Sequence, residues 1–395
     1  MNVPLQRRFE TMAVLWFTTA IAIFLSIFWF LCAIPLFWPI LIPYLIYILR
    51  ATVHEDGSPT YTRSNFMRRL PVFKFYKNYF PLSLHRTVPL DASKNYIFGY
   101  HPHGIISHGA FGSFAVEEDS QGGAFARLFP GIRNTLLTLD SNFRIPGYRE
   151  YLLSLGLASV SRRSCENILR GINSPIARPN PPTSGRFNIR SILLAPLTFP
   201  VHVLTTIGIL RPSYPVHTQA NPAPELNGRA ITIVIGGAAE SLYAHPGTLN
   251  LILHRRRGFL KLALRENALL VPVLGFGEND IYEQLTPSKG SIIHKIQQAV
   301  KRAVGFTMPL FHARGVFNYD VGVLPYRRDI NVVVGKPVGL PGQGEEGGHR
   351  EATDDEVREL MDLYIAELKR MWDAHKDEFA KNRKEGPEGE MVLLE

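Results

Sequence analysis

Two histidines in one short motif are the residues of this chain best suited to do chemistry. Residues 100–104 read Tyr-His-Pro-His-Gly and follow the apolar stretch 95–99, so we expect a strand ending in a turn where a helix begins. In that place His101 or His103 could accept a proton from an alcohol while the alcohol attacks an acyl carbonyl. Free amide groups at the helix start could stabilise an oxyanion or hold phosphate.

A second junction of the same kind carries a carboxylate. The apolar residues 231–235 run into Gly236, Gly237 and Glu240. Two such junctions in one sheet predict one cleft, in which Glu240 orients an imidazole or stabilises its protonated form. The two glycines permit close backbone approach to a ligand, although the rest of a dinucleotide or P-loop fingerprint is missing.

A basic cluster is the third candidate element. Arg255, Arg256 and Arg257 precede Lys261, and Arg265 lies one turn further along the same predicted helix. Such a cluster could grip the phosphates of a nucleotide-containing donor. A solvated or lipid-facing basic surface would have the same composition.

The two histidines also fit two other roles. Either one could be a satisfied core or turn residue, as most single histidines are. Histidines two residues apart can also share a metal ion, but no cysteine cluster or His-Glu helical motif completes a ligand set. We therefore expect no metal site.

The elements that must position these residues follow from hydrophobic patterning. Near-continuous apolar runs, such as 268–274 and 330–334, indicate strands covered on both faces, and they alternate with helical stretches. This predicts an α/β layered domain with a mixed or mainly parallel sheet. Thr353 and Glu356 form a predicted capping box at the start of the clearest helix, whose apolar stripe is typical of a packing surface.

The amino end has the pattern of a membrane segment. Residues 13–49 contain no Asp, Glu, Lys, Arg or His. As one helix they would reach roughly 55 Å, against a hydrocarbon core of about 30 Å. Pro35, Pro39 and Pro43 interrupt the second half, so we expect a hydrophobic hairpin or two short spans, with basic flanks on the cytosolic side. A signal peptide would have a shorter apolar region and a cleavage site.

Composition restricts the compartment and the partners. Only Cys32 and Cys165 are present, and Cys32 lies in the apolar run, so we expect no disulfide framework and a catalytic region in the reducing cytosol. The net charge of +9 is spread along the chain without a nucleic-acid motif. Attraction to an anionic membrane fits better than nucleic acid, and a soluble basic surface is the plain alternative.

The chain divides by composition into four regions. They are a membrane hairpin (1–50), a basic and aromatic membrane-proximal segment (51–91), the α/β domain (92–345), and a C-terminal amphipathic helix with its tail (346–395). The α/β domain contains a proline-rich insertion at about 167–229. Its stretch 167–224 has ten prolines and no Asp or Glu, which fits a membrane-dipping loop, a disordered insertion or translated non-coding sequence.

Several motifs in order along the chain resemble the type-2 diacylglycerol acyltransferase family, which includes monoacylglycerol acyltransferases and wax synthases, and most of all its fungal members. The motifs are 79–81 (Tyr-Phe-Pro), 100–104, 129–133 (Phe-Pro-Gly-Ile-Arg), 142–144 (Asn-Phe-Arg), 149–152 (Arg-Glu-Tyr-Leu), 236–241 (Gly-Gly-Ala-Ala-Glu-Ser), 257–264 and 275–279 (Gly-Phe-Gly-Glu-Asn), with Gly315 and 335–337 in similar segments. Together they cover most of 79–337 outside the insertion.

The resemblance implies a membrane-anchored, glycerolipid-acyltransferase-like domain that moves a fatty acyl group from acyl-CoA to the free hydroxyl of diacylglycerol, making triacylglycerol. It implies location in the endoplasmic reticulum membrane and on lipid droplets, with acyl-CoA as co-substrate and no cofactor. Monoacylglycerol, fatty alcohol or lysophospholipid acceptors, and a catalytically silent droplet-associated protein, stay as alternatives. The sequence leaves an oligomer open.

The site expected from the resemblance has His103 as base, His101 as a positioning residue and Glu240 as the acidic partner. Related glycerolipid acyltransferases pair a histidine with an aspartate five residues later, but His108 and Ile106 stand at those places here. The insertion is a second departure from the family and puts the activity of the chain as written in question. Substrate binding is assigned to residues of the two junctions and of the basic cluster: Gly104, Gly236, Gly237, Arg256, Arg257 and Lys261.

Overall fold

The structure is a computed structural model of the 395-residue chain, and it describes residues 4–117, 123–173, 228–284, 311–316, 322–345 and 351–394. The chain forms two compact units. Unit 1 comprises Met1–Thr18, Leu70–Leu136 and Leu226–Glu395, and unit 2 comprises Thr19–Arg69 and Leu137–Glu225. Most of the predicted insertion, 174–227, lies outside the described residues.

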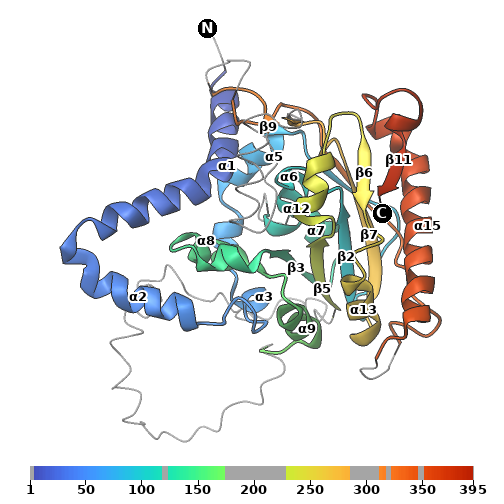
Figure 1. Cartoon of the computed structure of the whole chain (residues 1–395), viewed down its shortest axis with the longest axis horizontal. Coiled ribbons are helices and arrows are strands. Elements are labelled where there is room, and N and C mark those ends of the chain that lie inside the picture. Colours follow the sequence, from blue (N-terminus) through green and yellow to red (C-terminus); the bar gives the residue numbers. More distant parts are fainter. Residues whose placement is uncertain are drawn as a thin grey trace, which may run out of the picture. The chain divides into compact units, whose positions relative to one another are not determined.

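The apolar amino end is broken into two helices, as predicted. Helix α1 (Leu5–Cys32) ends before the short turn η1 (Pro35–Phe37), and helix α2 (Trp38–Arg50) follows (Figure 1). We expected prolines to make the second half a poor helix, but α2 is continuous because Pro39 lies in its first turn, where a missing N–H costs nothing, and only Pro43 lies inside. Among the described residues, α1 is the one helix long and apolar enough to cross a membrane.

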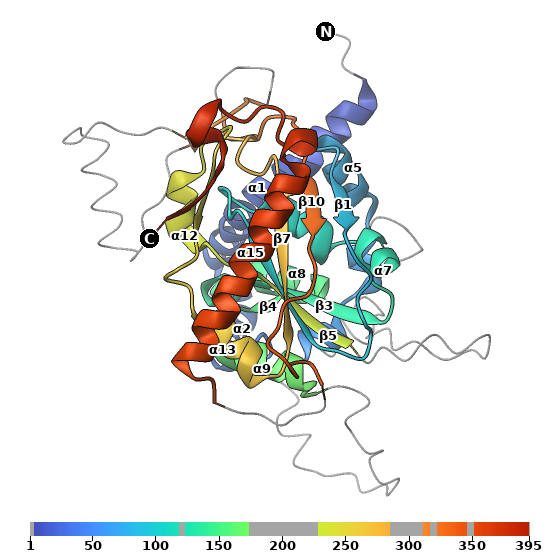
Figure 2. The same cartoon turned by 90° about the vertical axis from the view of Figure 1, so that its right-hand side faces the viewer.

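The main sheet of unit 1 is built from the predicted apolar runs. Its strands are β1 (Ser83–Arg86), β2 (Tyr96–His101), β3 (Ile132–Thr138), β5 (Gly228–Val234), β7 (Leu269–Phe276) and β10 (Asn331–Val334). They lie in the order β1-β10-β7-β2-β5-β3, and β10 and β7 are the one antiparallel pair in this order. Strands β7, β2, β5 and β3 are labelled in Figure 1, and β1 and β10 in Figure 2. The chain is therefore an α/β protein with a mainly parallel sheet.

Short strands and helices complete unit 1. The strands form two small pairs, β6 (Leu249–Ile252) with β11 (Met391–Leu394) and β8 (Glu283–Gln284) with β9 (Phe311–His312). The helical elements are α5 (Pro71–Tyr79), α6 (His108–Ala110), the π-helical turn η2 (Phe111–Ala115), α7 (Gly123–Leu128), α12 (Gly237–Glu240), η5 (Ser241–Tyr243), α13 (Gly258–Arg265), α15 (Asp354–Phe379) and η6 (Gly386–Gly389).

Strand β2 shows how the sheet is covered on both faces. Phe98 packs on Phe114 and Phe125, with ring centroids 5.9 and 5.6 Å apart, so this face meets η2 and α7. The next residue, Gly99, points to the opposite face, where the hydroxyl of Tyr364 from α15 occupies the space that a Cβ would need. Figure 2 shows α15 running across this face of the sheet. All six residues of β2 are buried, as the apolar run predicted.

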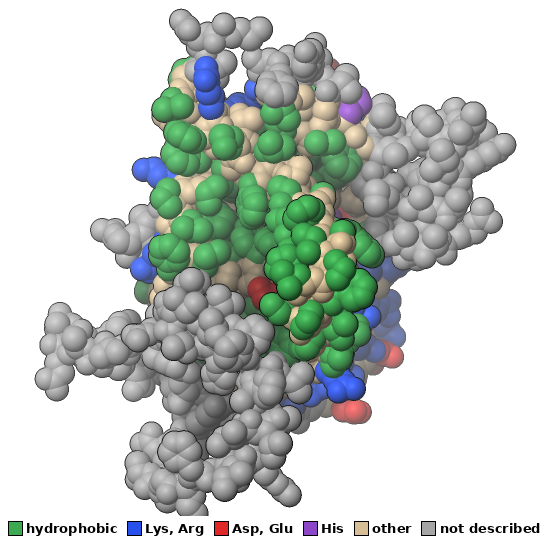
Figure 3. Space-filling model, turned by 90° about the vertical axis from the view of Figure 1, so that its left-hand side faces the viewer, with side chains coloured by type: hydrophobic (Ala, Val, Ile, Leu, Met, Phe, Trp, Pro, Cys, Tyr) green, Lys and Arg blue, Asp and Glu red, His purple; other side chains and the backbone are tan. Residues whose placement is uncertain are grey.

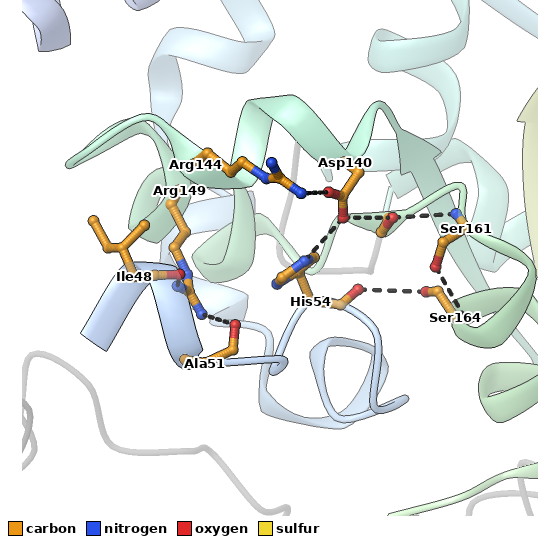
Figure 4. A network of polar contacts seen from close by, with 9 residues as sticks. Ile48, Ala51, His54, Asp140, Arg144, Arg149, Ser161 and Ser164 are labelled. Carbon is orange, nitrogen blue, oxygen red and sulfur yellow. Dashed lines mark hydrogen bonds and ion pairs between the residues drawn. The ribbon is translucent and has the colours of Figure 1, made fainter. Parts of the chain in front are cut away.

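Unit 2 contains α2 and short elements held together by polar contacts. The elements are α3 (Pro59–Thr62), α4 (Asn65–Arg68), η3 (Asp140–Arg144), α8 (Tyr148–Leu155), β4 (Ala158–Ser159) and α9 (Arg162–Arg170), and β4 pairs with the last two residues of β3. The buried Arg149 of α8 donates hydrogen bonds to the carbonyl oxygens of Ile48 and Ala51 (Figure 4). Since these carbonyls belong to the last turn of α2, Arg149 caps that helix.

The predicted capping box of α15 is present. The hydroxyl of Thr353 accepts a hydrogen bond from the main-chain N–H of Glu356, whose carboxylate accepts one from the N–H of Thr353. We expect Thr353→Ala to lower the free energy of unfolding by about 1 kcal/mol. Thermal unfolding of the detergent-solubilised protein would measure this. The control Thr52→Ala removes an exposed threonine that caps no helix, and an equal loss there would contradict the prediction.

Candidate active site

Three parallel strands end at one edge of the sheet, and the candidate residues follow them. Strand β2 pairs in parallel with β5 on one side and with β7 on the other. The carboxyl ends of the three strands therefore bring the turn after His101, the junction at Gly236 and the segment at Glu278 side by side. The prediction that the first two junctions meet is confirmed, and the third junction joins them.

Glu240 and His103 are in direct contact, but not through the imidazole. Oε1 of Glu240 accepts a 2.6 Å hydrogen bond from the main-chain N–H of His103, and Oε2 accepts one of 2.8 Å from the N–H of Ile252 in β6. The expectation that Glu240 orients the ring is thus replaced by a different arrangement, in which the carboxylate holds the backbone of the turn. Burial raises the pKa of Glu240 to about 7.

The ring of His103 is half-buried and has a free nitrogen. Its Nδ1 lies 3.2 Å from the carbonyl oxygen of Gly104, while Nε2 has no hydrogen-bond partner in the described part of the chain. Burial lowers the pKa of His103, with a smaller lowering from the nearby guanidinium of Arg256. The imidazole is therefore neutral near pH 7 and able to accept a proton at Nε2.

His101 is sealed inside the protein. It has no exposed surface, and its Nε2 lies 3.0 Å from the hydroxyl of Tyr364, which donates to the carbonyl oxygen of Gly99. Burial lowers the pKa of His101 to about 3. Because Tyr364 gives its proton to Gly99, the Nε2 of His101 must donate to Tyr364, so His101 ties the end of β2 to α15.

The amide groups expected to be free after the turn are already bonded. Helix α6 begins only at His108, and the main-chain N–H groups of His108 and Gly109 donate to the carboxylate of Glu278 at 2.7 and 2.8 Å. The prediction that amides at this helix start bind an oxyanion or phosphate is therefore wrong for these two groups. Glu278 is buried and also accepts a 2.8 Å hydrogen bond from the hydroxyl of Tyr100.

Two glycines of the site are required by close packing. Gly104 has φ +59°, and a Cβ there would lie 2.7 Å from Cγ of Glu278. At Gly236 a Cβ would collide with the carboxylate of Glu240. Gly237, with φ +63°, faces the guanidinium of Arg256, whose Nη2 would lie 3.2 Å from an added Cβ. All three predicted glycines thus surround the carboxylates and Arg256.

The predicted basic residues fall into two groups. Arg256 is half-buried and donates a 2.9 Å hydrogen bond from Nη2 to the carbonyl oxygen of Gly236, which places its charge beside Glu240 and His103. Arg257 is exposed at the start of α13. Lys261 is partly exposed and forms a 3.1 Å ion pair with Asp354. Only Arg256 is in contact with the junctions.

Residues that sequence reasoning missed complete the site. Tyr364 carried no local signal beyond the apolar stripe of its helix. Glu278 belongs to the motif 275–279, which marks the resemblance but indicates no role for the carboxylate. The position of His108, five residues after His103, did not indicate that its ring lies between the hydroxyls of Tyr76 and Tyr282, at 2.8 and 2.9 Å.

The arrangement of possible metal ligands bears on the alternative that the two histidines hold a metal ion. Within the described ranges, one group of three ligand-type side chains lies close together, namely His54, Glu55 and Asp140 of unit 2. It does not include His101 or His103. Asp140 in that group is already bonded to His54, Arg144 and Ser159 (Figure 4).

Known proteins match the chain over nearly its whole length. The family model for diacylglycerol acyltransferases matches residues 29–177 and 191–386. The chain belongs to the diacylglycerol acyltransferase family. The match confirms the resemblance drawn from the motifs. Between the two matched segments only 178–190 is left out, so the family model covers the rest of the predicted insertion at about 167–229, and the expected departure from the family is limited to 178–190.

Three relatives show how similar the chain is to individual known proteins. Diacylglycerol O-acyltransferase 2A of Umbelopsis ramanniana is 41% identical over 97% of this chain and 90% of the relative. Diacylglycerol O-acyltransferase 1 of Schizosaccharomyces pombe is 38% identical over 93% and 88%. The bovine 2-acylglycerol O-acyltransferase 1 is 35% identical over 100% and 98%. No solved structure matches the chain.

Proposed function

We propose that the chain transfers a fatty acyl group from acyl-CoA to the free hydroxyl of diacylglycerol, making triacylglycerol. The observation that carries this proposal is the half-buried ring of His103, with Nε2 free, in a chain that aligns over 97% of its length with a diacylglycerol acyltransferase. In this proposal unit 1 is a layered domain of the glycerolipid-acyltransferase kind.

His103 acts as the general base. Its Nε2 takes the proton of the acceptor hydroxyl as the oxygen attacks the thioester carbonyl. The carbon–sulfur bond then breaks, and the proton on His103 passes to the departing CoA thiolate. The two substrates supply every atom of the products, so the step balances without a metal or a redox cofactor.

Acyl-CoA is held by the basic cluster. Arg256 contacts the junction directly and can reach a group beside the turn, while the exposed Arg257 and Lys261 are placed to meet phosphates further out. Gly104, Gly236 and Gly237 let the side chains of Glu278, Glu240 and Arg256 pack directly against the backbone of the junctions that face the thioester. In this assignment Arg256 acts near the thioester of acyl-CoA, while Arg257 and Lys261 contribute to the affinity for acyl-CoA.

The lipid acceptor enters from a membrane beside α1. Many large apolar side chains of α1 and α2, such as those of Trp29, Phe30 and Trp38, are exposed. Figure 3 shows hydrophobic side chains gathered on one face of the molecule. The first part of α1 contacts the site region, because the ring of Phe17 lies 5.1 Å from that of His108. We assign the two helices to a hairpin in the endoplasmic reticulum membrane or the lipid-droplet surface, with the sheet of unit 1 in the cytosol.

The test is acyl transfer by the full chain. It would be expressed in a yeast strain unable to make triacylglycerol, and microsomes would be given labelled acyl-CoA with diacylglycerol, beside the His103→Ala variant and a version lacking residues 171–227. Labelled triacylglycerol from the full chain that His103→Ala abolishes is the expected result. Activity only in the shortened version would make the family function right and the insertion inhibitory.

A second set of acceptors tests the alternatives. The bovine relative is named for acylation of 2-acylglycerol, so monoacylglycerol, a fatty alcohol and a lysophospholipid would be offered in parallel. Faster transfer to one of these would overturn diacylglycerol as the acceptor. No transfer to any acceptor by a normally expressed, membrane-bound protein would point to a silent lipid-associated protein.

A further inference from the structure

We propose that Glu278 is a positioning residue for acyl transfer, whose carboxylate fixes the far end of the turn that carries His103. This inference rests on the proposed function and concerns the same site. The carboxylate of Glu278 bonds to Tyr100, His108 and Gly109, and not to the imidazole of His103. It acts through the backbone of residues 103–109, and so through the place and direction of the His103 ring.

The turn is held at both ends by buried carboxylates. At its start, Glu240 from the β5 junction accepts the N–H of His103. At its end, Glu278 from the β7 junction accepts the N–H groups of His108 and Gly109. Both carboxylates are about 1% exposed, so no water competes for these donors. The carboxylates that follow β5 and β7 thus hold the two ends of the turn that follows β2, the strand between them.

The backbone of the turn needs such support. Gly104 and Ser107 both have left-handed conformations, with φ +59° and +60°. For Ser107 this conformation costs on the order of 1 kcal/mol, and such residues persist where the surroundings determine them. Two side-chain hydrogen bonds form inside the turn in the described structure, from the hydroxyl of Ser107 to the carbonyl oxygen of His103 and between Nδ1 of His103 and the carbonyl oxygen of the adjacent Gly104. The carboxylates add three hydrogen bonds from outside the turn, and these tie it to the β5 and β7 junctions.

Glu278 is the group that titrates near neutral pH among the titratable side chains that face one another here. It faces Tyr100 of β2, His108 of α6 and Tyr282 beyond β7. Burial keeps the pKa of both tyrosines well above the ordinary value and lowers the pKa of His108 to about 3, so none of them titrates near neutrality. Burial raises the pKa of Glu278 to about 7.

The experiment compares Glu278→Gln with Glu367→Gln in microsomes and in the solubilised protein. Glutamine keeps the shape beside Gly104 but loses the charge that strengthens three hydrogen bonds. Glu367 is a matched control, because it is also a buried carboxylate of unit 1 that accepts a main-chain N–H, from Lys336, and it lies outside the turn. The readouts are kcat and KM for both substrates, and thermal unfolding.

We expect Glu278→Gln to lower kcat about 10- to 100-fold with KM for acyl-CoA within twofold, since a small misplacement of a reacting group has effects of that size. Glu367→Gln should lose stability with little change in kcat. Wild-type kcat should also rise between about pH 6 and 8 with the ionisation of two carboxyl groups, Glu240 and Glu278, and Glu278→Gln should show a shallower, one-group rise.

Other outcomes are decisive too. Retention of kcat within threefold by a folded Glu278→Gln protein would overturn the inference, as would an unchanged pH profile. If the glutamine variant does not fold, Glu278→Asp is measured in its place. Aspartate keeps the charge, but its side chain is shorter by one methylene, so the carboxylate is moved away from the turn. Normal kcat in this variant would also overturn the inference. An inactive wild-type chain would instead count against the proposed function.

Discussion

Replacing His103 by alanine is expected to lower kcat about 10²- to 10⁴-fold, the usual contribution of a general base. The free Nε2 of His103 is the acceptor for the substrate proton, and no other described imidazole of the turn is both neutral and open. Since alanine removes no contact to the phosphates, KM for acyl-CoA should change by less than about threefold. Labelled triacylglycerol formed in microsomes under saturating substrate measures this effect.

The matched comparison is with two other histidines. His101→Ala should act on stability, because it leaves a cavity and removes the partner of Tyr364 in a fully buried place. His245→Ala changes a half-buried histidine outside residues 103–109 of the turn and should leave kcat unchanged. A stable His101→Ala protein without activity, beside an active His103→Ala protein, would reverse the two assignments.

Replacing Arg256 by alanine is expected to lower kcat/KM about 100-fold, whereas Arg257→Ala should cost less than about fivefold. Arg256 donates to the carbonyl of Gly236 and keeps a positive charge beside Glu240 and His103. Its loss therefore disturbs the junction and removes a cation from the reacting end of acyl-CoA. Arg257 is exposed, and solvent screens its charge. Acyl-CoA titrations at fixed diacylglycerol measure both values.

Arg256→Lys separates charge from geometry. Lysine carries the charge but lacks the planar fork of donors, so it should recover only part of the lost kcat/KM. Equal effects of Arg256→Ala and Arg257→Ala would contradict the separate role of Arg256 and show that the cluster binds phosphate as a diffuse basic surface.

Much of the fold could be predicted because its signals are local. The apolar runs at 95–99, 231–235, 268–274 and 330–334 correspond to β2, β5, β7 and β10, since strands buried on both faces are apolar at every position. The capping box at Thr353 depends on residues three apart. The prolines of the amino end were harder, because the cost of a proline depends on its place in the helix, and Pro39 lies where that cost is small.

The candidate site also combines features with a local signal in the sequence and features without one. Local patterns were enough to predict two histidines and a carboxylate at the ends of strands, and the ordered motifs were enough to predict the family. The pairs of atoms that meet depend on strand order and register, which join residues far apart in the chain. Glu240 bonds the backbone of His103 from 137 residues away, and Glu278 bonds that of His108 from 170. Tyr364 meets His101 across 263 residues, where no local pattern can record the contact.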